Sequence, residues 1–325
     1  MKRFLIIAAL VALFFPELAS AQPPVIDYAP SATYFFAQKE GIDLYMDVYD
    51  PAPESEISFE GHAKPAILWL FGGGFMIGER SAPNYLSWFK LLNDNGYRVI
   101  TADYRKSLEG EKLGFGPLDV IPTSKKFINA SCEVGVQDCY SAVNYILENS
   151  ETLGVDPKGI VVSGSSAGAL ISVTAEWELV NRMPNASVLP EDFNFAGVMC
   201  FSGGIMTDKG APKWVSEPCP QLFFHGTSDK LVNYNKVQLF KIGIFGSSAL
   251  VERLKKQGYQ YNIVRVENRG HDIAESMIFY WQQEKQWLEQ NVMLGIKRTT
   301  DETINDPSQP GWWDASVKVL SEVFE

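Results

Sequence analysis

The sequence predicts an α/β protein whose central sheet is mostly parallel. Three observations predict this fold class: short runs rich in β-branched and aromatic residues, helical apolar patterns between those runs, and runs that are apolar on both faces. A strand without a polar face is typical of a sheet that helices cover on both sides. The predicted parallel strands are Ala66–Phe71, Tyr97–Asp103, Gly159–Ser163, Ala196–Phe201, Gln221–His225 and Tyr261–Val266.

An antiparallel pair, Ala32–Gln38 and Leu44–Tyr49, is expected before these strands. The clearest helix is predicted at Asp138–Asn149, where apolar residues recur at i, i+3, i+4, i+7 and i+8. Two further helices are predicted at Ala249–Gln257 and Ile273–Gln290. We therefore expect antiparallel strands at the N-terminus of the sheet and helices on both of its faces.

The first residues have the pattern of a secretory signal peptide. Lys2 and Arg3 precede an uncharged apolar run, Phe4–Phe15, and the small residues 19–21 follow it. This order predicts a leader over residues 1–21, cleavage before Gln22, and export to the periplasm or the medium. A membrane anchor is the weaker alternative, because a spanning helix needs roughly 20 apolar residues.

The rest of the chain is expected to form one domain and a short tail. No internal repeat or low-complexity linker interrupts residues 22–298, which we interpret as a single α/β domain. Residues 299–325 are rich in Asp, Asn, Pro and Gly at their start, which predicts a loop and an appendage that carries Trp312 and Trp313.

The composition excludes some partners. Lys and Arg number 28 against 39 Asp and Glu, a formal charge of −11, so nucleic acids are poor candidates. The four cysteines have no CxxC spacing, which argues against a zinc site; they are compatible with disulfides in an exported protein or with buried thiols. No stable membrane insertion of the mature chain is expected.

The sharpest local signal is Gly164-Ser165-Ser166-Ala167-Gly168. It stands directly after a predicted strand and before a helical pattern, which is the context of a Gly-x-Ser-x-Gly nucleophile turn. The alternative is an ordinary Gly/Ser turn. Its position between strand and helix predicts that Ser166 is a nucleophile.

A serine hydroxyl needs a base, and the sequence offers three histidines. His62 lies in a polar stretch before the first core strand, and His225 closes a buried strand, where a structural or supporting role is expected. His271 follows the last predicted parallel strand, so its loop belongs to the edge of the sheet that carries Ser166. We therefore assign the base to His271.

The histidine in turn needs a carboxylate that holds one tautomer and stabilises its cation. Asp229 follows the strand that ends at His225 and belongs to the same edge. Glu267 and Asp272 are alternatives, but both stand too close to His271 in sequence for a clean contact with Nδ1. Asp229 is the predicted acid.

Gly72-Gly73-Gly74 follows the first core strand and predicts an oxyanion hole. Glycines let the backbone approach a reacting carbonyl, and the predicted donors are the N–H groups of Gly73, Gly74 and Ala167. A dinucleotide-binding loop, with Asp103 on the ribose, is the alternative use of these glycines. Its spacing is wrong for G-x-G-x-x-G, and it leaves the serine, histidine and aspartate without a role.

These motifs, in the order glycine loop, serine, aspartate and histidine, resemble the α/β-hydrolase superfamily and its carboxylesterase/lipase branch. Asp103-Tyr104-Arg105 and Val155-Asp156-Pro157 add to the resemblance, which extends over about residues 32–291. In detail the chain is similar to compact bacterial acyl esterases that act on acetyl or feruloyl groups of plant polysaccharides. It departs from many of them at Phe71, where they have histidine, and at Ala169, where they often have glycine.

The resemblance implies a serine ester hydrolase that works through an acyl-enzyme and needs no metal or organic cofactor. Its expected partner is a small-molecule or carbohydrate-linked ester. A serine peptidase of the same fold and an inactive binding protein are the alternatives.

Overall fold

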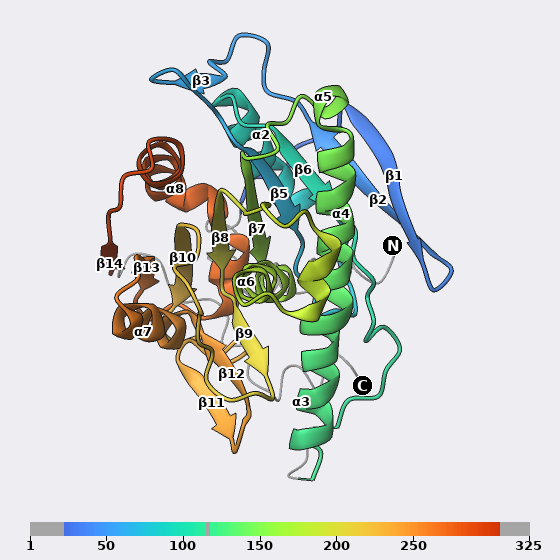
Figure 1. Cartoon of the computed structure of the whole chain (residues 1–325), viewed down its shortest axis with the longest axis vertical. Helices are drawn as coiled ribbons and strands as arrows, with labels where there is room; N and C mark the ends of the chain where they lie inside the picture. The colour runs from blue at the N-terminus through green and yellow to red at the C-terminus, as the bar shows by residue number, and fades with distance from the viewer. Residues whose placement is uncertain (1–22, 115–117, 306–325) are drawn as a thin grey trace, which may run out of the picture.

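The computed structural model of the 325-residue chain describes residues 23–114 and 118–305. The predicted signal peptide therefore lies outside the described residues. A nine-stranded sheet forms the centre, in the order β1-β2-β6-β5-β7-β8-β10-β13-β14 (Figure 1). Its strands are β1 (Ala32–Lys39), β2 (Ile42–Tyr49), β5 (Ala66–Leu70), β6 (Val99–Ala102), β7 (Ile160–Ser165), β8 (Gly197–Phe201), β10 (Gln221–Gly226), β13 (Asn262–Val266) and β14 (Thr300–Ile304).

The sheet is mostly parallel, as the sequence predicts. The pairings β1–β2 and β2–β6 are antiparallel, and every other pairing in this sheet is parallel. The strands from β5 to β8 and β10 are buried along their whole length, which explains their unbroken apolar runs. The predicted fold class is confirmed.

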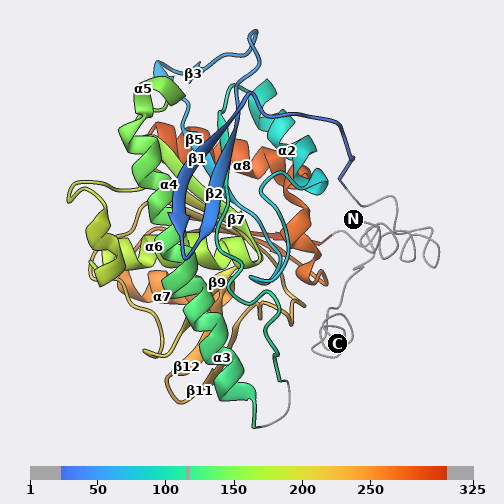
Figure 2. The ribbon, with the colours of Figure 1, turned by 90° about the vertical axis from the view of Figure 1, so that its right-hand side faces the viewer.

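Helices cover both faces of the sheet. Figure 2 shows α4, α6 and α7 on one side and α2 and α8 on the other. The α-helices are α2 (Pro83–Asp94), α3 (Val120–Ile128), α4 (Val136–Glu148), α5 (Ser150–Leu153), α6 (Ala167–Val180), α7 (Ser247–Gln257) and α8 (Trp281–Trp287). Shorter or wider turns are the 3-10 segments η3 (Pro184–Val188), η4 (His271–Glu275) and η5 (Met277–Tyr280), and the π segments η2 (Asn129–Gly135) and η6 (Leu288–Met293).

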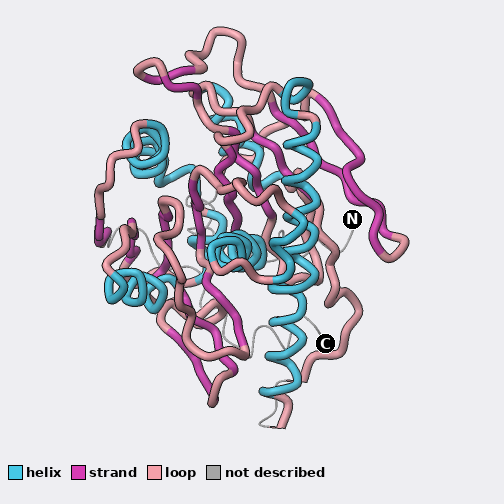
Figure 3. Tube along the Cα trace, viewed as in Figure 1, coloured by secondary structure: helices cyan, strands magenta, loops and turns pink. Residues whose placement is uncertain are grey.

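Two small antiparallel sheets lie outside the central one. One has the order β11-β12-β9 and is made of Lys236–Leu239, Ile242–Gly246 and Gly204–Thr207; Figure 3 shows it beyond the ends of the central strands. The other is the hairpin of β3 (Ser58–Phe59) and β4 (His62–Ala63). None of these strands is predicted from the sequence, because they are short and several are exposed.

The predicted helix over residues 273–290 is wrong as a continuous element. The structure has η4, η5, α8 and η6 there, and the backbone leaves helical angles at Ser276 and Tyr280. The Ser276 hydroxyl donates to the carbonyl oxygen of Asp272 at 2.7 Å. A serine that bonds the backbone locally competes with helix formation, which explains one of these breaks.

The predicted boundary at residue 298 also needs correction. The start of the predicted tail, Thr300–Ile304, is strand β14, which pairs in parallel with β13. The strand is polar because it lies at the edge of the sheet and is largely exposed, so it lacks the apolar run that marks the inner strands. Trp312 and Trp313 lie outside the described residues.

All four cysteines are free thiols in the structure. Cys132, Cys139 and Cys200 are buried, and burial raises the pKa of each thiol to about 12. Cys219 is half-buried and its thiol pKa is raised as well, first by desolvation. Of the two alternatives left open by the sequence, the structure therefore has the thiols.

Candidate active site

Ser166 stands on a sharp turn between β7 and α6. Its φ is 50° and its ψ is −115°, a strained conformation for a residue other than glycine. A Cβ on Gly168 would lie 2.0 Å from the carbonyl oxygen of Leu70, and one on Gly164 would lie 2.4 Å from the carbonyl group of Gly168. Glycine at both positions therefore allows the close approach of helix and strand that presents the half-buried Ser166 side chain.

Two hydrogen bonds link the predicted serine, histidine and aspartate. His271 Nε2 lies 2.8 Å from Ser166 Oγ, and His271 Nδ1 lies 2.8 Å from Asp229 Oδ2. With the proton on Nδ1 donated to the carboxylate, Nε2 accepts the hydrogen bond from the serine hydroxyl. The structure thus brings His271 into contact with Asp229, 42 positions before it in the chain, and with Ser166, 105 positions before it.

The loops that carry the aspartate and the histidine meet at a glycine. Gly226 ends β10, and a Cβ there would lie 2.3 Å from the carbonyl oxygens of both Arg269 and Gly270. Because β10 and β13 are parallel neighbours, both loops leave the sheet at its carboxyl edge. Asp229 and His271 therefore reach the same point from adjacent strands.

Asp229 is held as a carboxylate by several donors. The backbone N–H groups of Leu231 and Val232 donate to Oδ1 at 2.9 and 3.1 Å. Burial works to raise the Asp229 pKa, but the charge of His271 and hydrogen bonds from His225 and His271 outweigh it, so the pKa lies below its usual range. The carboxylate is consequently fixed in position and in its charged state.

His225 is a second histidine in contact with this carboxylate. Its Nε2 lies 2.9 Å from the carbonyl oxygen of Val232 and 3.2 Å from Asp229 Oδ2, while Nδ1 lies 2.8 Å from Ser247 Oγ. A carbonyl oxygen only accepts hydrogen bonds, so Nε2 carries a proton. The supporting role expected for His225 is what the geometry shows, whereas the part of Ser247 left no signal in the sequence.

The competing residues are engaged elsewhere. His62 is exposed in β4. Asp272 forms an ion pair with Arg269 and accepts a hydrogen bond from the Gly270 N–H, and Glu267 accepts one from Asn305. None of these contacts involves the serine or the base.

The glycine loop lies against the serine turn. A Cβ on Gly72 would lie 3.0 Å from Ser165 Oγ and 3.3 Å from Ser166 Cβ. Gly73 and Gly74 have φ values of +129° and +62°, which glycine adopts without strain. Among the described residues, their N–H groups donate to no carbonyl in the backbone hydrogen bonds of turns and loops.

Ala167, beside the serine, is the third predicted backbone donor. It is the first residue of α6, and the N–H groups of a helix's first turn have no partner within the helix. The three predicted donors thus come from two segments that touch at Gly72 and Ser166. Over residues 23–114 and 118–305, no group of three or more His, Cys, Asp or Glu side chains is arranged to hold a metal ion.

A surface cavity of about 690 Å³ lies away from this site. It is lined by residues between 179 and 194 and by residues 216–219, which include neither the serine nor its partners. No helix within the described part of the chain is long and apolar enough to cross a membrane.

The strand order and the turn that carries Ser166 are those of the α/β-hydrolase fold. Comparison with solved structures agrees: the chain superimposes on a thermophilic esterase from Thermogutta terrifontis with a TM-score of 0.54, at 21% identity, over 79% of this chain and 93% of that one. At this level of identity the likeness concerns the fold.

Sequence comparison shows a likeness to carboxylesterases over part of the chain. Residues 33–177 match the carboxylesterase family model. The bile salt-activated lipase of Bos taurus is 28% identical over 130 residues, which are 38% of this chain and 19% of the lipase. The para-nitrobenzyl esterase of Bacillus subtilis (strain 168) is 29% identical over 127 residues, 39% of this chain and 23% of that protein.

The chain spans about a fifth of the length of these curated relatives. The matches confirm the predicted resemblance to the carboxylesterase/lipase branch of the α/β-hydrolase superfamily.

Proposed function

We propose that this protein is a serine carboxylic-ester hydrolase. The observation that carries the proposal is the unbroken chain of hydrogen bonds from Ser166 through His271 to Asp229, with a glycine loop in contact with the serine turn. The match of residues 33–177 to the carboxylesterase family supports the same reaction class.

The arrangement performs acyl transfer in two steps. His271 Nε2 takes the hydroxyl proton as Ser166 Oγ forms a bond to the ester carbonyl carbon, and the carbonyl oxygen becomes an oxyanion. The N–H groups of Gly73, Gly74 and Ala167 donate to that oxygen. The ester C–O bond then breaks, and the alcohol leaves with the proton from His271. Water repeats both steps on the acyl-enzyme and releases the acid.

Asp229 stabilises the imidazolium that forms in each step. Its lowered pKa keeps it ionised at neutral pH, and its bond to Nδ1 holds His271 in the tautomer whose Nε2 is free to accept a proton. The carboxylate is a fixed charge and does not itself take the proton.

We further propose acetyl or feruloyl esters of plant polysaccharides as substrates of an exported enzyme. The resemblance to compact acyl esterases and the leader-like residues 1–21 support this proposal. N-terminal sequencing of the protein recovered from the medium or periplasm should begin at Gln22; a protein retained in the cytoplasm with Met1 intact would contradict export.

The test of the reaction compares Ser166→Ala with Ser141→Ala, a half-buried serine of α4. Each purified protein is incubated with p-nitrophenyl esters of increasing acyl length, acetylated xylan, methyl ferulate, peptide p-nitroanilides and a fluorophosphonate probe. We expect ester turnover and probe labelling in the wild type and in Ser141→Ala, and neither in Ser166→Ala.

Faster cleavage of the peptide substrates than of any ester would favour the peptidase alternative. Absence of turnover of every ester by folded wild type would refute the proposed reaction, and labelling of Ser166→Ala would refute the nucleophile.

A further inference from the structure

The peptide group between Phe71 and Gly72 is held at both of its polar ends. The hydroxyl of Tyr104 donates to the carbonyl oxygen of Phe71 at 2.8 Å, and the N–H of Gly72 donates to the hydroxyl oxygen of Tyr85 at 3.1 Å. Both contacts are buried. One peptide plane is therefore fixed by two phenols, directly before the two glycines that supply the proposed oxyanion donors.

The two tyrosines come from different elements and are rigidly packed. Tyr104 follows β6, is 3% exposed, and stacks on the ring of Phe71 with centroids 4.3 Å apart and planes at 20°. Tyr85 lies in α2, is 5% exposed, and packs edge-on against Trp69 at 5.1 Å. Neither hydroxyl can move away without displacing core side chains.

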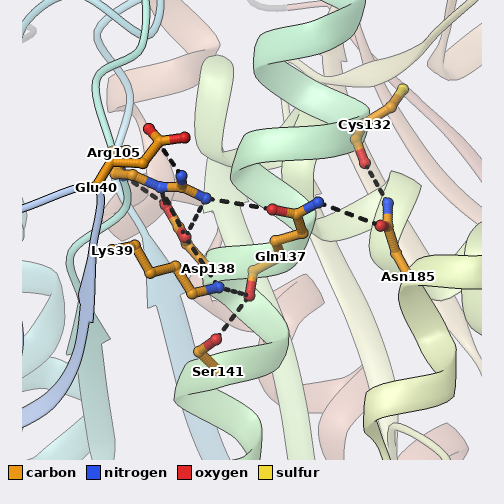
Figure 4. Close-up of polar contacts among 8 residues, drawn as sticks. All are labelled: Lys39, Glu40, Arg105, Cys132, Gln137, Asp138, Ser141 and Asn185. Carbon is orange, nitrogen blue, oxygen red and sulfur yellow. Dashed lines mark hydrogen bonds and ion pairs between the residues drawn. The ribbon is translucent and has the colours of Figure 1, made fainter.

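A buried ion pair anchors the segment that carries Tyr104. Arg105 and Asp138 of α4 are joined by several hydrogen bonds, including one from the Arg105 backbone N–H at 2.7 Å, as Figure 4 shows for the side chains. Glu40 of the β1–β2 turn adds a further contact to the guanidinium group at 3.1 Å. Tyr104 is thus tied to α4 and to the sheet at once.

The loop needs such anchors because its own residues supply no stiffness. Glycine has the largest conformational freedom of any residue, and Gly72, Gly73 and Gly74 are consecutive. On the far side the loop is closed by bonds from the N–H groups of Met76 and Ile77 to the carbonyl oxygen of Gly73, both 3.1 Å. On the near side the clamped peptide fixes the direction in which the chain enters the glycines.

We propose that Tyr85 and Tyr104 are positioning residues that clamp the 71–72 peptide, so that the N–H groups of Gly73 and Gly74 point at the developing oxyanion. This inference rests on the proposed ester hydrolysis. Preorganised donors stabilise an oxyanion without reorganisation at the moment of reaction, so a loosened loop lowers kcat more than it changes substrate binding. Burial raises the pKa of both phenols, so the clamp stays protonated at working pH.

The experiment deletes one hydroxyl at a time, with Tyr85→Phe and Tyr104→Phe. The matched control is Tyr140→Phe, because Tyr140 is equally buried and donates to the carbonyl oxygen of Ala175 at 2.7 Å, outside the loop. For each variant we measure kcat and KM on p-nitrophenyl acetate, the inhibition constant of an alkyl trifluoromethyl ketone, which forms an oxyanion on the serine, and amide hydrogen exchange in residues 71–78.

We expect either clamp variant to lower kcat about 10- to 50-fold with KM within about twofold, a smaller loss than removal of an oxyanion donor itself. The inhibition constant of the ketone should rise in step with the loss of kcat, and exchange in residues 71–78 should become faster. Tyr140→Phe should change none of the three. Unchanged kcat and ketone affinity in a folded clamp variant would overturn the proposal.

The hydrogen-exchange measurement tests the clamp independently of ester hydrolysis. If wild type turns over no ester, the proposed function fails, and hydrogen exchange alone decides the clamp: unchanged exchange of residues 71–78 in both variants would overturn it. If one clamp variant does not fold, the other carries the test, since each removes a bond to the same peptide group.

Discussion

The two halves of the site are built on different principles. The serine turn and the glycine loop lie within the stretch that matches the carboxylesterase family, and they depend on backbone shape: positive φ angles and contacts that a Cβ would block. Asp229 and His271 lie beyond residue 177 and depend on side-chain hydrogen bonds between loops.

The difference explains why the first half is easier to recognise from sequence. A close backbone approach admits only glycine, so it requires that residue at a fixed position in the sequence. A hydrogen-bonded carboxylate requires a single Asp or Glu, and such residues are common in turns. Variants of each half test this comparison, and the largest effect is expected in the second.

Asp229→Asn should lower kcat by about 10³- to 10⁴-fold, because the amide favours the wrong His271 tautomer and removes the charge that stabilises its cation. Folding should survive, since the amide keeps an oxygen for the Leu231 and Val232 N–H groups. Steady-state kinetics beside thermal unfolding measures both. A loss below about tenfold would mean that another carboxylate serves the histidine.

Gly168→Ala tests the backbone half and should lower kcat by about 10²-fold while destabilising the fold by about 1–3 kcal/mol. The added Cβ would lie 2.0 Å from the Leu70 carbonyl oxygen, so α6 must move and carry Ser166 with it. Gly159→Ala is the matched control, because its Cβ meets neighbours at ordinary distances of 3.4 Å and more. Urea unfolding and steady-state kinetics are measured on both variants. Equal kcat values and equal free energies of unfolding would show that the serine turn tolerates a side chain at position 168.

His225→Phe should have the smallest effect on activity, about a tenfold loss of kcat, because it removes one donor to Asp229 and leaves the others. His225→Gln keeps an N–H donor and should recover part of the loss. His62→Gln, at an exposed position, should behave as wild type.

His225→Phe should also change the stability of the protein in acid, in a direction that the pKa of Asp229 sets. The folded-state pKa of Asp229 is depressed, so its stabilisation is present above the unfolded-state pKa of about 3.8 and is lost as pH falls through the lower folded value. His225→Phe should raise that folded value, so the midpoint of acid unfolding should move to higher pH. A midpoint unchanged from that of wild type would show that His225 does not act on the carboxylate.

Much of the fold could be predicted because the inner strands are apolar on both faces and the helix α4 has a regular apolar stripe. Strands β9, β11 and β12 could not, since each has only four or five residues, too few for a clear pattern, and β11 is exposed. The single helix expected over residues 273–290 was wrong because the backbone leaves helical angles at Ser276 and Tyr280, and the hydrogen bond from the Ser276 hydroxyl to the Asp272 carbonyl oxygen accounts for the first of these breaks.

In the site, Ser166, His271 and Asp229 were predicted and are joined by hydrogen bonds in the structure. Of their supports, His225 was expected, but Ser247 and Tyr85 were not: Tyr85 has the sequence signature of any buried position in an apolar helix face. Its role depends on how α2 packs against the loop, which no local pattern records.

The polar edge strand β14 has a practical consequence for anyone who produces this protein. A recombinant chain ended at residue 298, where the sequence suggests a domain boundary, would lose Thr300–Ile304 and leave the backbone of β13 unpaired along one side. That newly open edge includes the buried Ile263 and Val264, the kind of edge that recruits other chains and aggregates. Soluble material should therefore be sought with the chain kept at least through Asn305, where Asp301 and Glu302 supply the charge that discourages such pairing.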